Sequence, residues 1–216
     1  MITLTTFRSV PPFAAGYVRD LRVRWALEEA GLPYTLRLID FEEAALPGYR
    51  KEQPFGQIPV LHDGDRVLFE TGAILLHLGE RHPALLPPAE REQVTMWMFA
   101  ALNSVEPYLA DLAMLAMFHA DEAWAGARRP AVEELALKRL DSLDVWLDGR
   151  DWLAGSFSVA DILMVSVLRL LDSMNLVKRY VRLHAYKTRC TERPAFRKAL
   201  ADQLALYTHQ PAAISN

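Results

Sequence analysis

The chain has 216 residues, of which 51% are hydrophobic, enough apolar material for one large packed domain or two small ones. Its formal net charge of −3 argues against an electrostatic footprint for nucleic acid or for an anionic membrane surface. Its single cysteine, Cys190, excludes an internal disulfide and a Cys-x-x-Cys redox pair, and a late helical position is typical of an inert buried cysteine.

The first residues give no sign of export. Met1–Thr5 leads directly into a strand pattern, without a basic segment, an apolar stretch and a small-residue cleavage site in succession. No uninterrupted apolar run in the chain is long enough to cross a bilayer. We therefore expect a soluble protein that stays in the cytoplasm.

The N-terminal part predicts a strand, a loop, a helix and a second strand. Ile2–Phe7 alternates branched and polar residues, as a half-buried strand does. The loop Arg8–Gly16 contains two consecutive prolines. Apolar residues then recur with helical spacing over residues 18–30, and Gly31 is a typical C-terminal cap. The segment Tyr34–Ile39 has the composition of a second strand.

The next segments complete a small mixed sheet. A short helix or turn is expected over Glu42–Lys51, followed by strands at Ile58–Leu61 and Val67–Phe69 and a helix at Thr71–Arg81. The element order is therefore β-α-β-α-β-β-α. This order, with parallel and antiparallel strands in one sheet, predicts a thioredoxin-like α/β fold.

The composition changes after residue 81. Prolines are dense over residues 82–89, which predicts a linker, and no strand pattern recurs beyond it. Helices are expected from Glu90 to about His119 and over Pro130–Asp148, Ser158–Asp172, Tyr180–Thr191 and Pro194–Leu204. We therefore predict an α/β thioredoxin-like domain over 1–81, a linker over 82–89 and an all-α helical bundle over 90–216.

One helix start in the C-terminal half is strongly marked. Ser158 as the N-cap residue and Asp161 three residues later form the pattern of a capping box, which satisfies two backbone donors and fixes where the helix begins. The segment Ile162–Val165 is apolar on every face, so this helix should be the central one of its domain. We expect Asp161 to act in folding rather than in ligand binding.

The segment Phe55–Leu61 is the most informative in the chain. Pro59 cannot donate to a sheet ladder, so a strand can begin here only through a tight, cis Ile58-Pro59 bond. The main-chain N–H and C=O of Ile58 then remain available to pair with an extended peptide. Glu70 and Thr71 open a helix whose first N–H groups can hold a carboxylate. The sequence therefore predicts a pocket for a short anionic peptide.

Three segments carry a resemblance to a known family. Phe55–Leu61 with Glu70 and Thr71, Arg22–Tyr34 and Phe157–Ile162 match the cytosolic glutathione transferases in order and spacing, over the whole chain. The resemblance implies a thioredoxin-like domain that binds glutathione and a helical domain that binds the second substrate. It also implies a detoxification enzyme with glutathione as co-substrate, organised as a homodimer.

The resemblance assigns the glutathione site to Gln57, Ile58, Pro59, Glu70 and Thr71. The main chain of Ile58 is expected to hold the cysteinyl part of glutathione, while Glu70 accepts from the ammonium. The hydroxyl and N–H of Thr71 suit the γ-glutamyl carboxylate, and threonine keeps the hydroxyl of the serine that is usual in the family. Thr71 is also a simple helix cap. Gln57 contacts the glycyl end or is an ordinary solvent-facing glutamine.

The sequence leaves two hydroxyl-bearing residues as the main candidates for activating the thiol. Counting back from the first helix favours Tyr17, which would share the helix N-terminus with the glutathione sulfur, whereas counting forward from the first strand favours Ser9. Arg19 is a third possibility, as a nearby cation. Lowering a thiol pKa from about 8.5 to about 6.5 requires roughly 2.7 kcal/mol of preference for the thiolate. A helix N-terminus alone supplies at most about 2 kcal/mol, so a hydroxyl or a cation is expected.

The electrophile site is expected to be mainly apolar. The resemblance places it between the helix that begins at Glu90, the first loop and the C-terminal segment. We assign Phe13, Met114, Met117 and Phe118 to its lining. Methionine and aromatic stripes of this kind are also common in plain helix cores. The six histidines have no metal-ligand spacing, so no metal is assigned.

Three functions are compatible with these residues. The first is a transferase in which the glutathione thiolate attacks an electrophilic carbon. The second keeps the thiolate as a transient adduct, in an isomerase or a dehalogenase. The third is a transferase-like module that binds a protein partner without catalysis.

Overall fold

The computed structural model describes residues 1–209, which form two compact units. Unit 1 combines Met1–Leu85 with the segment that begins at Arg193, and unit 2 is Leu86–Glu192. The break between Leu85 and Leu86 lies inside the predicted linker. The predicted helical domain over 90–216 does not correspond to one unit, because the last helix is grouped with the N-terminal residues.

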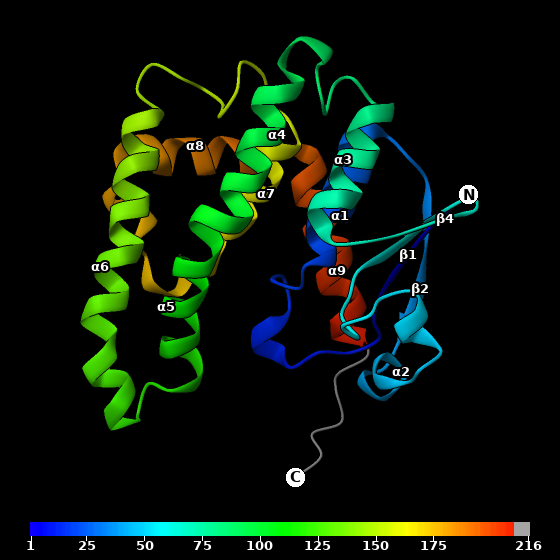
Figure 1. The fold of residues 1–216 in the computed structure, drawn as a ribbon, viewed down its shortest axis with the longest axis horizontal. Helices are drawn as coiled ribbons and strands as arrows, with labels where there is room; N and C mark the ends of the chain where they lie inside the picture. The colour runs from blue at the N-terminus through cyan, green and yellow to red at the C-terminus, as the bar shows by residue number, and fades with distance from the viewer. Residues whose placement is uncertain (210–216) are drawn as a thin grey trace. The chain divides into compact units, whose positions relative to one another are not determined.

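Unit 1 contains one four-stranded sheet in the order β2-β1-β3-β4 (Figure 1). Its strands are β1 (Ile2–Phe7), β2 (Tyr34–Ile39), β3 (Val60–Asp63) and β4 (Arg66–Phe69). β1 runs parallel to β2 and antiparallel to β3, and β3 is antiparallel to β4. This is the mixed sheet of the predicted thioredoxin-like fold, which is therefore confirmed.

Alternating side chains divide this sheet into two faces. In register, Phe7 lies beside Ile39, and Val60 lies beside Phe69, so these four side chains share one face. They pack with residues from the segment around α2 (Phe41–Ala45) and the 3₁₀ turn Tyr49–Lys51. The opposite face carries the helices α1 (Asp20–Ala30) and α3 (Thr71–Arg81), which contact each other (Figure 1).

The boundaries of α1 have clear local causes. Gly31 ends the helix in the left-handed conformation with a φ of 64°, as the predicted cap requires. The start lies at Asp20, beyond a series of turns through Gly16, whose φ is 84°. Tyr17 belongs to these turns and lies three residues before the first residue of α1.

The helix α9 (Pro194–His209) completes unit 1 by packing along α1. Gln203 Nε2 donates to Asp20 Oδ1 at 2.5 Å, and Phe196 contacts the edge of the Trp25 ring with centroids 4.8 Å apart. Burial raises the pKa of the Asp20 carboxyl although the Arg24 guanidinium lies 2.6 Å away. Residues separated by about 180 positions thus share one buried polar cluster.

Unit 2 is helical throughout its regular elements. These are α4 (Arg91–Phe99), a π-helix (Ala100–Val105), α5 (Glu106–Phe118), α6 (Ala123–Trp146), α7 (Val159–Leu168), α8 (Val181–Thr191) and three short 3₁₀ turns (Pro88–Glu90, Arg169–Met174 and Val177–Arg179). α7 is buried along nearly all its length and contacts α4, α5 and α8, as expected for the central helix (Figure 1). Within residues 1–209, none of the helices combines the length and apolar character that crossing a membrane requires.

The largest differences from the predicted helix ranges in unit 2 concern two helices. The helix expected to begin at Pro130 begins at Ala123, and Pro130 stands inside α6 on an exposed side of it. The proline lacks an N–H and therefore leaves one intrahelical bond unmade, which water can satisfy at the surface. The helix expected from Glu90 to about His119 is interrupted by the π-helix at residues 100–105.

Candidate functional site

Most of the predicted site residues lie in unit 1, on two loops and one helix start. The residues assigned to glutathione and to thiol activation are Ser9, Tyr17, Gln57, Ile58, Pro59, Glu70 and Thr71, and Phe13 lies in the same unit. Met114, Met117 and Phe118 belong to α5 of unit 2. Each unit is therefore considered by itself.

The loop before β3 is held by two side chains. The buried Gln53 side chain accepts from the main-chain N–H of Phe55 at 2.6 Å and of Gln57 at 3.2 Å. The Tyr49 hydroxyl donates to Gln57 O at 2.7 Å, and burial raises the pKa of Tyr49 to about 12, which keeps this donor protonated. The main chain on both sides of Gln57 is thus fixed by buried groups.

Gly56 allows this loop to pass close to α2. Its φ is 66°, and a Cβ atom built at this position would lie 2.8 Å from Ala44 O. An L-residue would therefore meet both an unfavourable backbone conformation and a main-chain contact. The glycine is required for the shape of the loop.

Ile58 combines an anchored side chain with unused main-chain groups. Its side chain packs against the cluster that contains Tyr49 and Val60, and the Ile58-Pro59 bond is cis, as predicted. Residues 1–209 supply no hydrogen-bond partner to the N–H or C=O of Ile58. An N–H and a C=O on one residue are the pair that an extended peptide needs for strand-like pairing.

The start of α3 presents a second set of polar groups. Glu70 is exposed and has a φ of 66°, an uncommon conformation for a residue with a side chain. The first intrahelical bond runs from Ile74 N–H to Glu70 O at 3.0 Å, so the three preceding N–H groups lie ahead of the ladder. Thr71 is buried, with 5% of its surface exposed.

A buried arginine lies beside this helix start. Arg22 on α1 is 4% exposed, and its Nη1 donates to Thr71 Oγ1 at 3.3 Å. The Thr71 hydroxyl therefore lies both at the positive end of the α3 dipole and beside a guanidinium. Both features favour a negative charge nearby.

The two predicted thiol-activating residues occupy different segments. Ser9 is partly buried and follows β1 by two residues, whereas Tyr17 is exposed in the turn before α1. The N–H of Tyr17 donates to Ala14 O at 2.9 Å. α1 begins at Asp20, so Tyr17 lies three residues before the helix, and its role in activating the thiol stays a prediction. Arg19, the third candidate, is exposed at the N-cap position of α1.

The residues predicted for the electrophile are all exposed. Phe13 stands in the 3₁₀ turn Pro12–Ala14, and Met114, Met117 and Phe118 stand on the last two turns of α5. Exposed apolar side chains are more informative than buried ones, because burial alone already explains a core residue. Their role in binding stays a prediction.

Comparison with known proteins matches most of the chain. The family described as glutathione S-transferase, N-terminal domain, matches residues 13–80, and the family described as glutathione S-transferase, C-terminal domain, matches residues 105–194. Glutathione S-transferase 1 of Zea mays is 31% identical over 198 residues, which cover 83% of this chain and 90% of the relative. The chain belongs to the glutathione S-transferase family. Glutathione S-transferase F10 of Arabidopsis thaliana is 29% identical over 205 residues, covering 88% and 95% of the two chains.

Solved structures give the same result for the fold of this family member. A glutathione transferase from Pseudomonas putida, with one glutathione disulfide bound per subunit, is 25% identical with a TM-score of 0.79, covering 92% of this chain and 90% of that one. Ure2p in complex with glutathione is 22% identical with a TM-score of 0.77, covering 93% and 94%. The second likeness, at this identity, concerns the fold alone.

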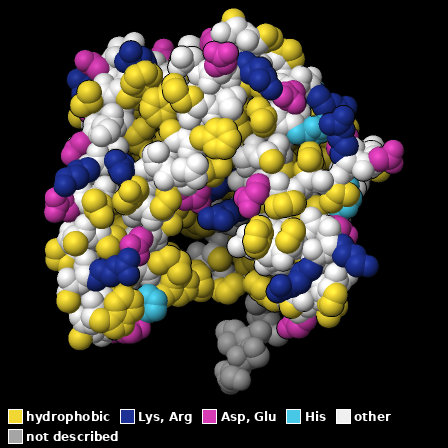
Figure 2. Space-filling model, viewed as in Figure 1, with side chains coloured by type: hydrophobic (Ala, Val, Ile, Leu, Met, Phe, Trp, Pro, Cys, Tyr) yellow, Lys and Arg dark blue, Asp and Glu magenta, His cyan; other side chains and the backbone are white. Residues whose placement is uncertain are grey.

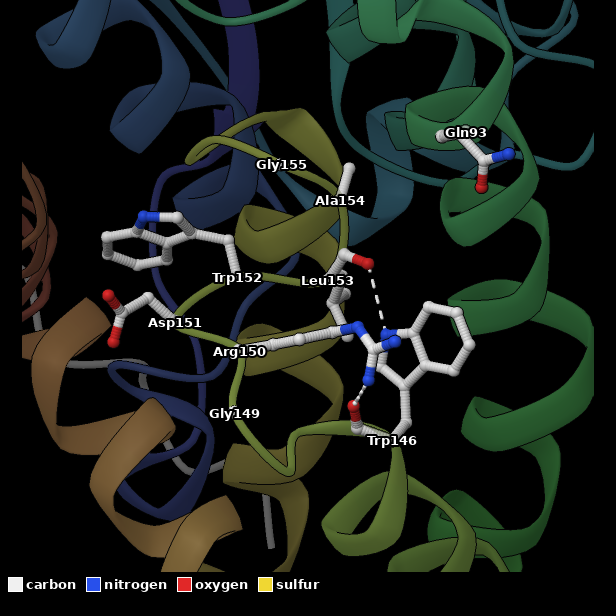
Figure 3. A pocket seen from close by; sticks show the side chains of 9 residues that line it. All are labelled: Gln93, Trp146, Gly149, Arg150, Asp151, Trp152, Leu153, Ala154 and Gly155. Atoms are coloured by element: carbon white, nitrogen blue, oxygen red, sulfur yellow. Dashed lines mark hydrogen bonds between the residues drawn. The ribbon is translucent and has the colours of Figure 1, made fainter.

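A separate pocket lies in the helical unit of this glutathione S-transferase (Figure 3). It has a volume of about 490 Å³ and is lined by Gln93, Trp146 and Gly149–Gly155. Two of the polar groups drawn there bond to main-chain oxygens of the same segment: Trp146 Nε1 donates to Leu153 O at 3.1 Å, and Arg150 Nη1 donates to Trp146 O at 2.7 Å. The Arg150 guanidinium also stacks 4.3 Å from the centre of a Trp146 ring. The pocket contains none of the predicted residues.

Charge is distributed without a dominant sign on the face shown in Figure 2. Basic and acidic side chains alternate over the visible elements, with hydrophobic side chains between them. Among residues 1–209, no three His, Cys, Asp or Glu side chains gather in a way that could hold a metal ion. A charged ligand would therefore be recognised by local contacts rather than by a field that covers a whole face.

Sequence reasoning missed three residues that shape the predicted glutathione site. Tyr49 and Gln53 hold the loop, and Arg22 contacts Thr71. Gln53 lies four residues before Gln57 and Arg22 opens the motif Arg22–Tyr34, but neither position in the sequence indicates a partner. Their burial is the informative property, because polar groups are seldom buried without one.

Proposed function

We propose that the protein is a glutathione transferase that joins the glutathione sulfur to an apolar electrophile. The observation that carries this proposal is the unpaired main chain of Ile58, two residues before β3. β3 pairs with β4, the strand that leads to the start of α3. Glutathione is a short extended peptide with an amino-acid head group, and a main-chain edge next to an anion-binding helix start suits both parts. Membership of the family supports the same ligand.

Each group of glutathione has a counterpart in unit 1. Ile58 pairs with the cysteinyl main chain, and the rigid loop around Gln57 keeps this edge in place without reorganisation on binding. Glu70 accepts from the γ-glutamyl ammonium, while Thr71 and the first N–H groups of α3 receive the carboxylate. Gln57, which is exposed, contacts the glycyl end, and Pro59 shapes the edge.

The chemical step needs a stabilised thiolate. Its sulfur attacks an electrophilic carbon, a carbon–sulfur bond forms, and the leaving group departs with the electron pair of the broken bond. A hydroxyl from Tyr17 or Ser9 donates to the sulfur and lowers the pKa of the thiol. Such a bond to a charged acceptor contributes about 1.5–3 kcal/mol, which corresponds to one to two pKa units.

Calorimetry with reduced glutathione tests the binding part. The wild-type chain should bind with a saturable heat, and Glu70→Gln should weaken binding about tenfold, because one ionic hydrogen bond is lost. Glu92→Gln, an exposed glutamate on α4, is the matched control and should bind as the wild type does. Absence of saturation with millimolar glutathione would reject the proposal.

Two conservative variants test the hydroxyl donor. Tyr17→Phe and Ser9→Ala each remove one hydroxyl. The variant that lacks the true donor should conjugate chlorodinitrobenzene about 10- to 100-fold more slowly, while its affinity for glutathione stays unchanged. The pH dependence of the rate should shift upward for the same variant, since the thiol becomes less acidic. If both variants keep the full rate, neither hydroxyl activates the thiol.

The electrophile is proposed to contact Phe13, Met114, Met117 and Phe118. Conjugation confined to small charged electrophiles would contradict this apolar lining. We also propose a homodimer, which light scattering at micromolar concentration tests, because a monomer mass would exclude it. Glutathione binding without conjugation would favour the transferase-like binding module. Turnover without net loss of glutathione would favour a glutathione-dependent isomerase or dehalogenase.

A further inference from the structure

One buried polar cluster joins three elements of unit 1 that are far apart in the sequence. Its centre is the Asp20 carboxyl at the start of α1, which is fully buried and accepts from Arg24 Nε at 2.6 Å. Gln203 of α9 donates to Asp20 Oδ1 at 2.5 Å, and the hydroxyl of Thr6, near the end of β1, also bonds to this carboxyl. The Tyr207 hydroxyl of α9 lies 3.3 Å from Thr6 Oγ1. β1, α1 and α9 therefore meet at one side chain.

This cluster holds both ends of the loop formed by residues 8–19. Thr6 lies two residues before the loop, and Asp20 follows it directly. The amide group of Gln203 has two hydrogens, and it donates to Val18 O at 3.2 Å as well as to Asp20 Oδ1. The last residues of the loop are thus held by a buried side chain of α9, a helix that lies almost at the other end of the chain.

The same loop carries the groups predicted to act at the sulfur. Ser9 and Tyr17 are the two candidate hydroxyl donors, and Tyr17 immediately precedes the residue whose carbonyl accepts from Gln203. A donor can stabilise a thiolate only from hydrogen-bond distance, and a displacement of about 1 Å can cost about 100-fold in rate. The conformation of the loop therefore determines whether either hydroxyl can activate the thiol.

We propose that Gln203 is a positioning residue for the conjugation reaction, which it serves by fixing loop 8–19. Because Gln203 is fully buried, it acts through the Val18 carbonyl and the Asp20 carboxyl rather than on a substrate. The argument holds whichever of the two hydroxyls donates, since the cluster anchors the loop on both sides of them. This inference rests on the proposed function and deepens it, because it makes α9 necessary for the chemical step.

Gln203→Leu tests this role, since leucine keeps apolar bulk but makes neither hydrogen bond. With chlorodinitrobenzene, kcat should fall about tenfold, while the KM for glutathione stays within about threefold of the wild-type value. The KM is spared because Ile58 and the start of α3 lie outside the loop. The pKa of the bound glutathione thiol, followed by the ultraviolet absorbance of the thiolate, should rise by about one unit.

Phe196→Leu is the matched control for a purely structural effect. It weakens the packing of the same two helices, at the contact with the Trp25 ring, more than one helical turn along α1 from Asp20. This variant should be less stable than the wild type but should keep its kcat and the pKa of the bound thiol. Thr6→Val removes the hydroxyl at the other end of the loop and should repeat the loss of kcat at constant KM. It provides the same test if Gln203→Leu fails to fold.

The outcomes distinguish this inference from the function on which it rests. A lower kcat with a raised thiol pKa in Gln203→Leu, and neither change in Phe196→Leu, would support the role of Gln203. An unchanged kcat in the folded Gln203→Leu and Thr6→Val variants, or an equal loss in Phe196→Leu, would overturn it. A wild-type chain that conjugates no electrophile would instead reject the proposed function, and the role of Gln203 with it.

Discussion

Replacing Asp161 with alanine should destabilise the helical unit, because four donors converge on this buried carboxylate. Leu153 N–H and the Tyr186 hydroxyl reach Oδ1 at 3.1 and 2.8 Å. The N–H and the hydroxyl of Ser158 reach Oδ2 at 2.9 and 3.2 Å, which confirms the predicted capping box. Alanine leaves these buried donors without an acceptor.

The magnitude follows from opposing effects. Loss of a helix cap costs about 0.5–2 kcal/mol, and each buried donor left unpaired costs about 1–3 kcal/mol. In the other direction, burial outweighs the donors and raises the pKa of Asp161 to about 6, so the ionised carboxylate is itself disfavoured in the folded state. Removing it recovers about 3 kcal/mol at pH 7. Because the unpaired donors outweigh this recovery, we expect a net loss of about 2 kcal/mol or more, which lowers the melting temperature by at least about 4 °C.

The same pKa shift gives the penalty a pH dependence with a definite sign. The folded-state pKa of about 6 lies above the ordinary value of 3.8, so the folded chain binds this proton more tightly than the unfolded chain does. Its contribution to stability is full below about pH 4 and is lost as the pH rises through 6. Alanine does not titrate. The penalty of Asp161→Ala should therefore be about 2 kcal/mol larger at pH 4.5 than at pH 7.

Urea unfolding at the two pH values, followed by circular dichroism, measures these differences. Asp121→Ala, which removes an exposed carboxylate near the start of α6, is the control and should stay within about 0.5 kcal/mol of the wild type. Glutathione affinity at pH 7 should not change, since Asp161 belongs to unit 2. An unchanged unfolding midpoint would refute the capping argument, and a penalty that grows with pH would refute the assigned direction of the pKa shift.

Two glycines and one glutamine allow further tests in unit 1. Gly56 and Gly64 have φ values of 66° and 61°, but only at Gly56 would a Cβ atom meet main chain, at 2.8 Å from Ala44 O. Gly64→Ala should lower the free energy of unfolding by about 1 kcal/mol and leave glutathione binding intact. Gly56→Ala should lower it by about 2–4 kcal/mol and weaken glutathione binding. Equal effects of the two substitutions would contradict the argument from the contact with Ala44. Gln203→Leu should lower the free energy of unfolding by about 1–3 kcal/mol, because Asp20 Oδ1 loses a donor at 2.5 Å. Gln93→Leu, at an exposed position, should not, and equal stability of the two variants would show that the bond to Asp20 contributes little.

Local patterns were sufficient for much of the fold. Ile2–Phe7, Tyr34–Ile39 and Thr71–Arg81 have the predicted boundaries, because alternation, helical periodicity and a marked start act within a few residues. The start of α6 was not predictable, since Pro130 is a common first residue of a helix and nothing local indicates that the helix begins earlier. The π-helix at residues 100–105 likewise has no local sequence signal from which it could be predicted.

The candidate site also has a part that the sequence predicts and a part that only the folded chain shows. The motif that contains Ile58 and Pro59 predicted an unpaired main-chain edge, since proline imposes a local constraint that no distant partner can remove. Gln53 and Arg22 could not be assigned a role, because each acts through a partner that only the folded chain brings near. Counting back from the first helix favoured Tyr17, which lies in the turns after Gly16, three residues before α1 begins at Asp20.

The position of α9 leads to a last prediction, about where the N-terminal folding unit ends. A fragment of residues 1–85 contains the whole sheet but lacks the partners of two fully buried α1 side chains, Asp20 and Trp25, which contact Gln203 and Phe196. Without α9 the Asp20 carboxyl loses a donor and the Trp25 ring becomes exposed, which together cost about 3–6 kcal/mol, comparable with the total stability of a small domain. The fragment should therefore unfold without a cooperative transition, whereas the full chain should show one by tryptophan fluorescence in urea. Cooperative unfolding of the fragment with full glutathione affinity would mean that α9 is an accessory helix and that the predicted domain over 1–81 folds independently.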